Sequence, residues 1–194
     1  MIKDLLYICG APGVGKSTLM RYLRLPWDME VVKGPPVPHT LLRSMNSGAL
    51  HGLELGVPRQ QHPGTDSLAM DISFRASDFL LRTPVDFALG EGARLATRPF
   101  LSRLTAAGVR VHLLYLYADD DVLDHRCAQR GTSQNYSWRK GAQTRAYNLA
   151  EWAAADGGID FHSMTSTHLV EPGCMAERVQ DIPALGFLTD GVRS

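Results

Sequence analysis

Residues 5 to 20, LLYICGAPGVGKSTLM, join an apolar run to a glycine-rich turn and the start of an amphipathic segment. The apolar run predicts a buried strand, and the segment after the turn predicts a helix from Lys16 to Leu25 that Pro26 ends. Between them, residues 10 to 17 (GAPGVGKS) match G-x-x-x-x-G-K-[ST], the Walker A phosphate-binding loop, in its usual place between strand and helix. The sequence therefore predicts a nucleoside triphosphate site.

The glycines of this loop allow the backbone to curl round a phosphate chain, so that successive N–H groups and the dipole of the following helix face the anion. Lys16 is then expected to reach the β- and γ-phosphates of ATP, and Ser17 to ligate Mg²⁺. The predicted nucleotide-binding residues are Ala11, Pro12, Gly13, Val14, Gly15, Lys16, Ser17 and Thr18.

Length and charge limit the number of domains and the kinds of binding partner that the chain can have. The chain has 194 residues, enough for a single α/β domain with a full core and short for two. Its 20 basic and 20 acidic residues cancel, so the summed charge predicts neither a polyanion-binding nor an acidic-surface protein. Neutrality does not exclude nucleic acid, because a local arginine cluster is enough to bind it.

Three scattered cysteines, Cys9, Cys127 and Cys174, have neither metal-ligand spacing nor the pattern of a disulfide framework. The first predicted strand begins almost at Met1, so no signal peptide is expected, and no apolar run reaches membrane-spanning length. We expect a reducing, cytoplasmic location.

Beyond Pro26, prolines break up residues 26 to 66, in which 36–44 and 49–57 are predicted to form short strands or a hairpin. We expect the larger segment 26–84 to bind the acceptor. A further helix is predicted to begin at Asp66, with Asp66 or Ser67 as its N-cap. Other helices are predicted over 77–84, 94–108, 119–130 and 146–154. Further strands are predicted over 85–89, 109–117 and 161–165. Residues 131–143 are expected to form a polar, basic excursion, and the tail from 168 to dock through Leu185, Phe187 and Leu188.

Alternating strands and helices predict a three-layer α/β fold of the P-loop NTPase type, a parallel sheet with helices on both faces. In such sheets ligands bind at the carboxyl ends of the strands, and Glu91 follows the third predicted strand. Glu91 is a candidate to hold Mg²⁺ through water or to take the proton of an acceptor hydroxyl, and Arg94 to face the same cleft. The alternatives are a Glu that complements a helix dipole and a solvated arginine.

A second acidic candidate is Asp66, preceded by Thr65 in a small turn. Asp66 could accept the proton of an acceptor hydroxyl, or simply cap a helix. Arg59 lies in a polar cluster with Gln60, Gln61 and His62 that is suited to reading a base or a phosphate.

The third group of candidates is basic. Arg126, Arg130 and Arg139 lie within 126–145, which we interpret as a lid that closes over the triphosphate and supplies cations to the transferring group. Arg126 and Arg130, four residues apart, share one helix face; a solvated basic face is the alternative. Tyr136 and Trp138 are suited either to stacking on a base or to holding the lid against the body.

The order of Walker A, acceptor segment, strand with a terminal acid, strand and arginine-bearing lid resembles the nucleoside and nucleotide kinases of the P-loop class, related to thymidylate kinase. The resemblance implies transfer of the γ-phosphate of ATP, with Mg²⁺, to a small acceptor. The D-G-[FY]-P-R and D-R-[YFH] signatures of adenylate and thymidylate kinases are missing, and residues 91–94 (EGAR) stand in their place.

Three segments, 53–70, 90–100 and 130–151, look similar to the phage-encoded 5-hydroxymethyluracil DNA kinases. This narrower resemblance implies a hydroxymethyl acceptor on a base in DNA, flanked by Thr65, Asp66 and Glu91, with Arg59 and the lid arginines at the strand or at ATP. A free nucleoside or nucleotide is the alternative acceptor. A nucleotide-dependent regulatory ATPase is a third hypothesis, although the chain has no N-K-x-D string of a GTPase.

Overall fold

The computed structural model describes residues 1–58, 64–129, 135–167 and 172–188. Its centre is one seven-stranded sheet in the order β2-β3-β4-β5-β1-β6-β7. The strands are β1 (Asp4–Gly10), β2 (Trp27–Val32), β3 (His39–Ser44), β4 (Leu50–Leu55), β5 (Phe87–Glu91), β6 (Arg110–Tyr117) and β7 (Ile159–Thr165).

Five of these strands, from β4 to β7 in the sheet order, run parallel, whereas β3 pairs antiparallel with both β2 and β4. The predicted parallel α/β sheet is therefore confirmed for its core, and the antiparallel pair β2 and β3 extends it. The predicted hairpin over 36–57 is present as β3 and β4. Strand β2 was not predicted.

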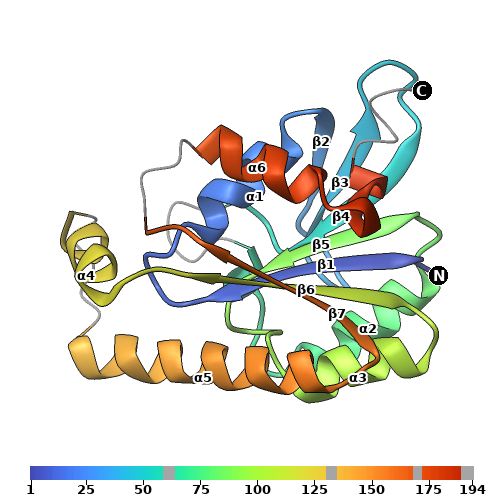
Figure 1. Ribbon diagram of the computed structural model, residues 1–194. Coiled ribbons are helices and arrows are strands. Elements are labelled where there is room, and N and C mark those ends of the chain that lie inside the picture. Colours follow the sequence, from blue (N-terminus) through green and yellow to red (C-terminus); the bar gives the residue numbers. More distant parts are fainter. Residues whose placement is uncertain (59–63, 130–134, 168–171, 189–194) are drawn as a thin grey trace.

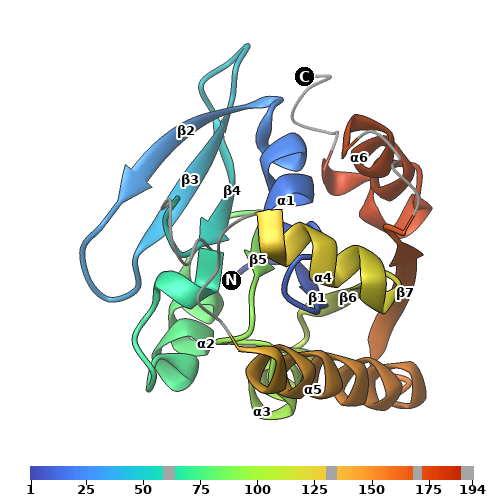
Figure 2. The same ribbon diagram turned by 90° about the vertical axis from the view of Figure 1, so that its left-hand side faces the viewer.

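Helices cover both faces of the sheet (Figure 1). On one face lie α2 (Ser73–Arg82), α3 (Arg98–Ala106) and α5 (Tyr136–Ala155), and on the other lie α1 (Lys16–Arg24) and α6 (Pro172–Gln180). Helix α4 (Asp120–Gln129) stands at the end of the sheet to which the parallel strands point (Figures 1 and 2). Two short 3₁₀ helices, η1 (Gly64–Ser67) and η2 (Pro183–Leu185), complete the elements of the described residues.

The core has two halves because successive side chains of β1 point to opposite faces. Leu5 and Tyr7 belong to the half under α2, α3 and α5, and Leu6 and Ile8 to the half under α1 and α6. The tail docks on the second half, where Leu185 and Leu188 are fully buried and Phe187 packs against the cluster, as the sequence predicted.

Three local predictions are wrong. The segment that opens at Asp66 is a single 3₁₀ turn, and the α-helix begins only at Ser73. The helix expected from residue 94 begins at Arg98, because residues 93–97 form an irregular loop. The expected excursion 131–143 is helical from Tyr136 onward, since Asn135 caps α5 by accepting a hydrogen bond from the N–H of Trp138.

Candidate active site

The loop between β1 and α1 has the backbone that its glycines permit. Gly13 and Gly15 adopt φ values of 86° and 99°, which residues with a Cβ rarely adopt. A Cβ on Gly13 would also lie 2.9 Å from Sγ of Cys127 on α4. The loop is therefore curled tightly and held against α4, and its backbone leads directly into the N-terminus of α1 at Lys16.

Lys16 folds back over this loop. Its Nζ donates hydrogen bonds to the carbonyl oxygens of Gly10, at 2.9 Å, and of Ala11, at 3.0 Å. The ammonium group thus lies within the curl of the loop, where a triphosphate chain would be cradled.

Ser17 and Glu91 join the loop to the neighbouring strand. The Ser17 hydroxyl donates to Oε1 of Glu91 over 2.9 Å, across the join between α1 and the carboxyl end of β5. Glu91 is only 3 % exposed. Burial raises the pKa of its carboxyl to about 7, with smaller opposing effects from Lys16 and from the Ser17 hydrogen bond.

The turn η1 packs directly on the end of β5. Thr65 Oγ1 donates to the carbonyl oxygen of Glu91 at 2.9 Å and also lies 2.9 Å from the hydroxyl of Tyr7. The Tyr7 hydroxyl in turn donates to the carbonyl oxygen of Gly92. These contacts fix the backbone on both sides of Glu91, so the predicted acceptor residue Thr65 lies directly beside the strand acid.

Asp66 does not cap a helix. Its Oδ1 accepts hydrogen bonds from the backbone N–H groups of Ala93, at 2.9 Å, and Arg94, at 3.0 Å. Ser67 does not cap one either, because its hydroxyl donates to the carbonyl oxygen of Gly64 within the same turn. The expected N-cap is therefore wrong, since the donors that Asp66 satisfies lie in the loop after β5, 27 and 28 residues along the chain.

Arg94 is half-buried beside this turn. Its Nε is buried and has no hydrogen-bond partner among the described residues. A buried guanidinium nitrogen without a partner is costly unless a ligand or water satisfies it. Arg59, the other predicted acceptor-binding cation, lies outside the described residues.

Arg126 braces the loop from its far side. Its guanidinium donates to Oγ of Ser166, at 3.1 Å, and to the carbonyl oxygen of the same residue, at 2.7 Å. Ser166, just beyond β7, donates its hydroxyl to the carbonyl oxygen of Val14 in the loop at 2.8 Å. Arg126 thus reaches the phosphate-binding loop through Ser166, and Arg130 lies outside the described residues.

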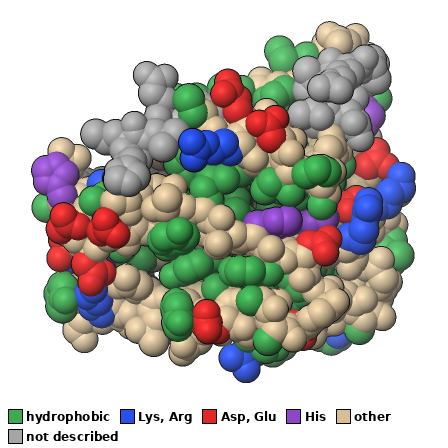
Figure 3. All heavy atoms as spheres, viewed as in Figure 1, with side chains coloured by type: hydrophobic (Ala, Val, Ile, Leu, Met, Phe, Trp, Pro, Cys, Tyr) green, Lys and Arg blue, Asp and Glu red, His purple; other side chains and the backbone are tan. Residues whose placement is uncertain are grey.

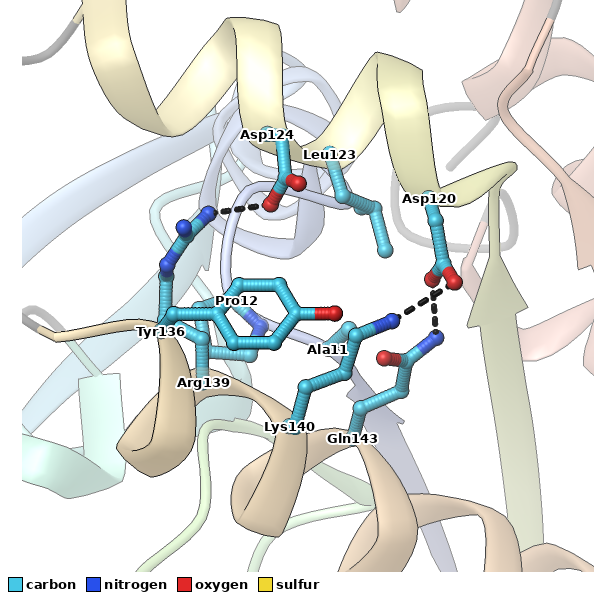
Figure 4. Close-up of a pocket in the computed structure, with 9 residues that line it drawn as sticks. All are labelled: Ala11, Pro12, Asp120, Leu123, Asp124, Tyr136, Arg139, Lys140 and Gln143. Atoms are coloured by element: carbon cyan, nitrogen blue, oxygen red, sulfur yellow. Dashed lines mark hydrogen bonds and ion pairs between the residues drawn. The ribbon is translucent and has the colours of Figure 1, made fainter.

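A pocket opens where the loop meets α4 and the first turns of α5 (Figure 4). Arg139 forms an ion pair with Asp124 at 2.6 Å, and Lys140 forms one with Asp120 at 2.6 Å. Acidic side chains gather over α4, at the left of Figure 3, and those of α5 that face them are basic. The lining residues are Ala11, Pro12, Asp120, Leu123, Asp124, Tyr136, Arg139, Lys140 and Gln143.

Sequence reasoning missed several contributors to this site. Tyr7 stands within an apolar strand and gave no polar signal, and Ser166 follows β7 without any motif. Asp120 and Asp124 have a readable signal, because their spacing of four places them on one face of α4 opposite a basic helix.

The fold and site define a P-loop kinase. The acid-bearing strand β5 lies directly beside the loop-bearing strand β1, and β1 separates β5 from β6 at the point where the strand order reverses. The chain belongs to the P-loop Nucleotide Kinase3 family, whose model matches residues 1–160. It is therefore a phosphotransferase of the P-loop class.

The fold is also shared with a solved structure, a gluconokinase from Sinorhizobium meliloti 1021. The two chains superpose with a TM-score of 0.53 over 99 % of this chain and 95 % of that chain, at 13 % sequence identity. The likeness extends over the whole chain and concerns the fold alone. A search of curated protein sequences finds no match.

Among the described residues, no helix is long and apolar enough to cross a membrane.

Proposed function

We propose that this protein transfers the γ-phosphate of ATP to a hydroxyl group, with Mg²⁺, and that its preferred acceptor is the hydroxymethyl group of 5-hydroxymethyluracil in DNA. The observation that carries the phosphoryl transfer is the 2.9 Å hydrogen bond from Ser17 to Glu91. It joins the phosphate-binding loop to an acid whose backbone carbonyl accepts a hydrogen bond from Thr65, while the adjacent Asp66 holds the loop that follows.

The donor set fits Mg²⁺. This ion usually keeps several waters and binds one or two protein oxygens together with substrate phosphates. Ser17 offers a hydroxyl oxygen and Glu91 a carboxylate, which would hold the ion through water. Among the described residues there is no group of three or more His, Cys, Asp or Glu that could hold a metal. When bound, Mg²⁺ would neutralise charge on the β- and γ-phosphates.

The other residues have roles that follow from their positions. Lys16 would leave the loop carbonyls for the β- and γ-phosphates. Glu91 or Asp66 would orient or deprotonate the acceptor hydroxyl, and Arg94 would bind the acceptor through its unpartnered Nε. Arg126 would hold the loop in shape through Ser166, and Arg139 would exchange Asp124 for a phosphate as the lid closes.

The hydroxymethyl acceptor rests on the sequence resemblance of residues 53–70, 90–100 and 130–151. A base within a duplex cannot reach a γ-phosphate held between β1 and β5, so the reaction would require the base to leave the stack. The second candidate is a small nucleoside or nucleotide, which the description of the matching family favours.

Transfer of label from γ-labelled ATP tests the proposal. Three acceptors are compared in parallel: DNA that contains 5-hydroxymethyluracil, ordinary DNA of the same sequence, and a panel of free nucleosides and nucleoside monophosphates. The proposal expects label only in the modified DNA and its loss in Lys16→Ala. Label in a free nucleotide would instead identify a metabolite kinase, and hydrolysis without any labelled acceptor would identify a regulatory ATPase.

A further inference from the structure

Charge is segregated along this neutral chain. Residues 92–118 and 125–150 hold nine of the 20 Lys and Arg residues and none of the 20 Asp and Glu residues. These two stretches contain α3 and most of α5. The two helices lie side by side beneath the sheet in both views (Figures 1 and 2), so the acid-free stretches meet on one face of the molecule.

One stripe of α5 carries the aromatic residues of this face. Trp138, Gly141, Arg145, Asn148 and Trp152 recur at intervals of three or four, which places them on one side of the helix. The stripe begins beside the candidate active site, because its first residue lies between two residues that line the pocket next to the phosphate-binding loop.

The two arginines of this face lie along the stripe. A Cβ on Gly141 would lie 3.4 Å from Nη1 of Arg145, so the Arg145 side chain runs back along the helix towards Trp138. Arg98, at the start of α3, places its guanidinium 5.6 Å from the centroid of the Trp152 ring, with Nη2 3.5 Å from the carbonyl oxygen of Asn148. The two indoles, Trp138 and Trp152, therefore stand at the ends of the stripe, with the two arginines between them.

These arginines differ from most of their neighbours. Arg103, Arg110 and Arg139, with Lys140, each form an ion pair with an Asp of another element. Arg98 and Arg145 are both exposed, and neither pairs with a carboxylate in the part of the chain that the structure describes. Trp138 is 47 % exposed, so much of its indole is open to solvent.

The geometry points to this stripe, formed by Trp138, Arg145, Arg98 and Trp152, as a binding track for a single DNA strand that leads to the active site. The exposed indole of Trp138 can stack on a base of any sequence, and arginines without a carboxylate partner attract phosphates. Trp152 is half-buried against the core and holds Arg98 in place through its ring. Trp138 and Trp152 are 14 residues apart along the helix and therefore about 21 Å apart, the length of about six stacked nucleotides. The role of this strand as the acceptor rests on the proposed function, whereas its binding does not.

Fluorescence anisotropy tests the track with a labelled single-stranded oligonucleotide of ordinary bases, without ATP. Arg98→Gln and Arg145→Gln should each weaken binding about fivefold at about 0.1 M salt and reduce the salt slope by about 0.7, the share of one phosphate contact to a single strand. The matched control is Arg178→Gln. It removes the same exposed charge from α6, on the opposite face of the sheet, and should leave both quantities unchanged.

Tryptophan emission reports on the stacking itself. The strand should quench the emission of the wild-type protein, and Trp138→Phe should retain binding but lose most of the quenching. Trp138→Ala should weaken binding about tenfold. Oligonucleotides much shorter than about six nucleotides should bind progressively more weakly, because they cover fewer contacts.

The track is overturned if the strand does not bind, or if it binds the Arg98→Gln, Arg145→Gln and Arg178→Gln variants with equal affinity. These binding outcomes do not depend on whether the protein transfers phosphate to DNA. Strand binding that depends on the stripe, with label found only in free nucleotides, would refute the DNA acceptor and retain the track. Label in modified DNA, transferred at unchanged rates by all three variants, would refute the track and retain the DNA acceptor.

Discussion

Gly64 and Glu91 approach each other so closely that no side chain fits between them. A Cβ on Gly64 would lie 2.7 Å from both the carbonyl oxygen and Oε1 of Glu91. Gly64 also has a φ of 61°, in the left-handed region. The turn that carries Thr65 and Asp66 can pack on the end of β5 only because this position is glycine.

We predict that Gly64→Ala destabilises the fold and abolishes phosphoryl transfer. The matched control is Gly48→Ala in the turn between β3 and β4, where φ is 70° but a Cβ would meet nothing within 4 Å. The control should lose about 1 kcal/mol through backbone strain alone, and Gly64→Ala a further 1–3 kcal/mol, roughly, through overpacking. Denaturant unfolding measures both values. Equal losses would show that the contact with Glu91 has no cost.

The raised pKa of Glu91 predicts a pH-dependent stability. The pKa is about 7 in the folded chain, against an ordinary value of 4.5, because burial penalises the carboxylate. The unfolded chain loses this proton first as pH rises, so Glu91 destabilises the fold progressively between these values, by about 3 kcal/mol above pH 7. Glu91→Gln should therefore be more stable than wild type near pH 8 and equally stable near pH 4.

This comparison is made without nucleotide and with a chelator, by thermal unfolding across pH. Asp86→Asn provides a control of opposite sign, because a hydrogen bond from Lys3 lowers the pKa of Asp86. Asp86 stabilises the fold above its unfolded pKa and loses that effect as pH falls through its folded pKa. The Asp86→Asn variant should therefore be less stable than wild type at neutral pH only. A Glu91→Gln variant that is less stable than wild type at pH 8 would contradict the argument.

Asp66 has a structural role that is separable from a catalytic one. Its Oδ1 holds the N–H groups of Ala93 and Arg94, and an asparagine oxygen can accept the same two bonds without charge. If Asp66 is the base, Asp66→Asn should keep wild-type stability and lose at least about 100-fold in kcat. Asp66→Ala should lose stability as well, by about 1–3 kcal/mol. Wild-type kcat in Asp66→Asn would leave Glu91 as the base.

The parts of the fold that the sequence predicted are those specified locally. The loop from Gly10 to Ser17 carries its own backbone requirements, and Glu91 could be placed because a parallel strand ends at the ligand-binding edge of its sheet. Strand β2 was missed because only its first residue, Trp27, is fully buried, and its place in the sheet depends on pairing with β3. Neither alternation nor a motif marks such an edge strand.

Long-range contacts account for the remaining errors. Asp66 has the residue type of an N-cap, yet its donors come from the loop after β5. The start of α5 did carry a local signal, the cap residue Asn135, but Gly141 and the polar residues around it favoured a loop. The pairing of Arg139 with Asp124 follows from how α4 and α5 face each other, which no single-sequence pattern contains.

A buried ion pair anchors the end of α1 on the sheet. Arg24, at the end of α1, bonds to Glu54 on β4 at 2.6 Å, and their side chains are 14 % and 4 % exposed. Removing one partner leaves a charge without compensation in the core, so Arg24→Met should cost about 3–5 kcal/mol. The double variant Arg24→Met/Glu54→Leu should recover most of this loss, because two apolar side chains replace the pair.

The pair of Arg43 and Glu30 provides the reference for this double-mutant cycle. It joins β3 to β2 at 3.3 Å, with side chains 35 % and 58 % exposed, so Arg43→Met should cost less than about 1 kcal/mol. Helix α1 begins with Lys16 and Ser17 and ends with Arg24, so its anchor on β4 also fixes the phosphate-binding end. Arg24→Met should therefore weaken ATP binding in calorimetry where Arg43→Met does not. Equal ATP affinities would confine Arg24 to a role in stability.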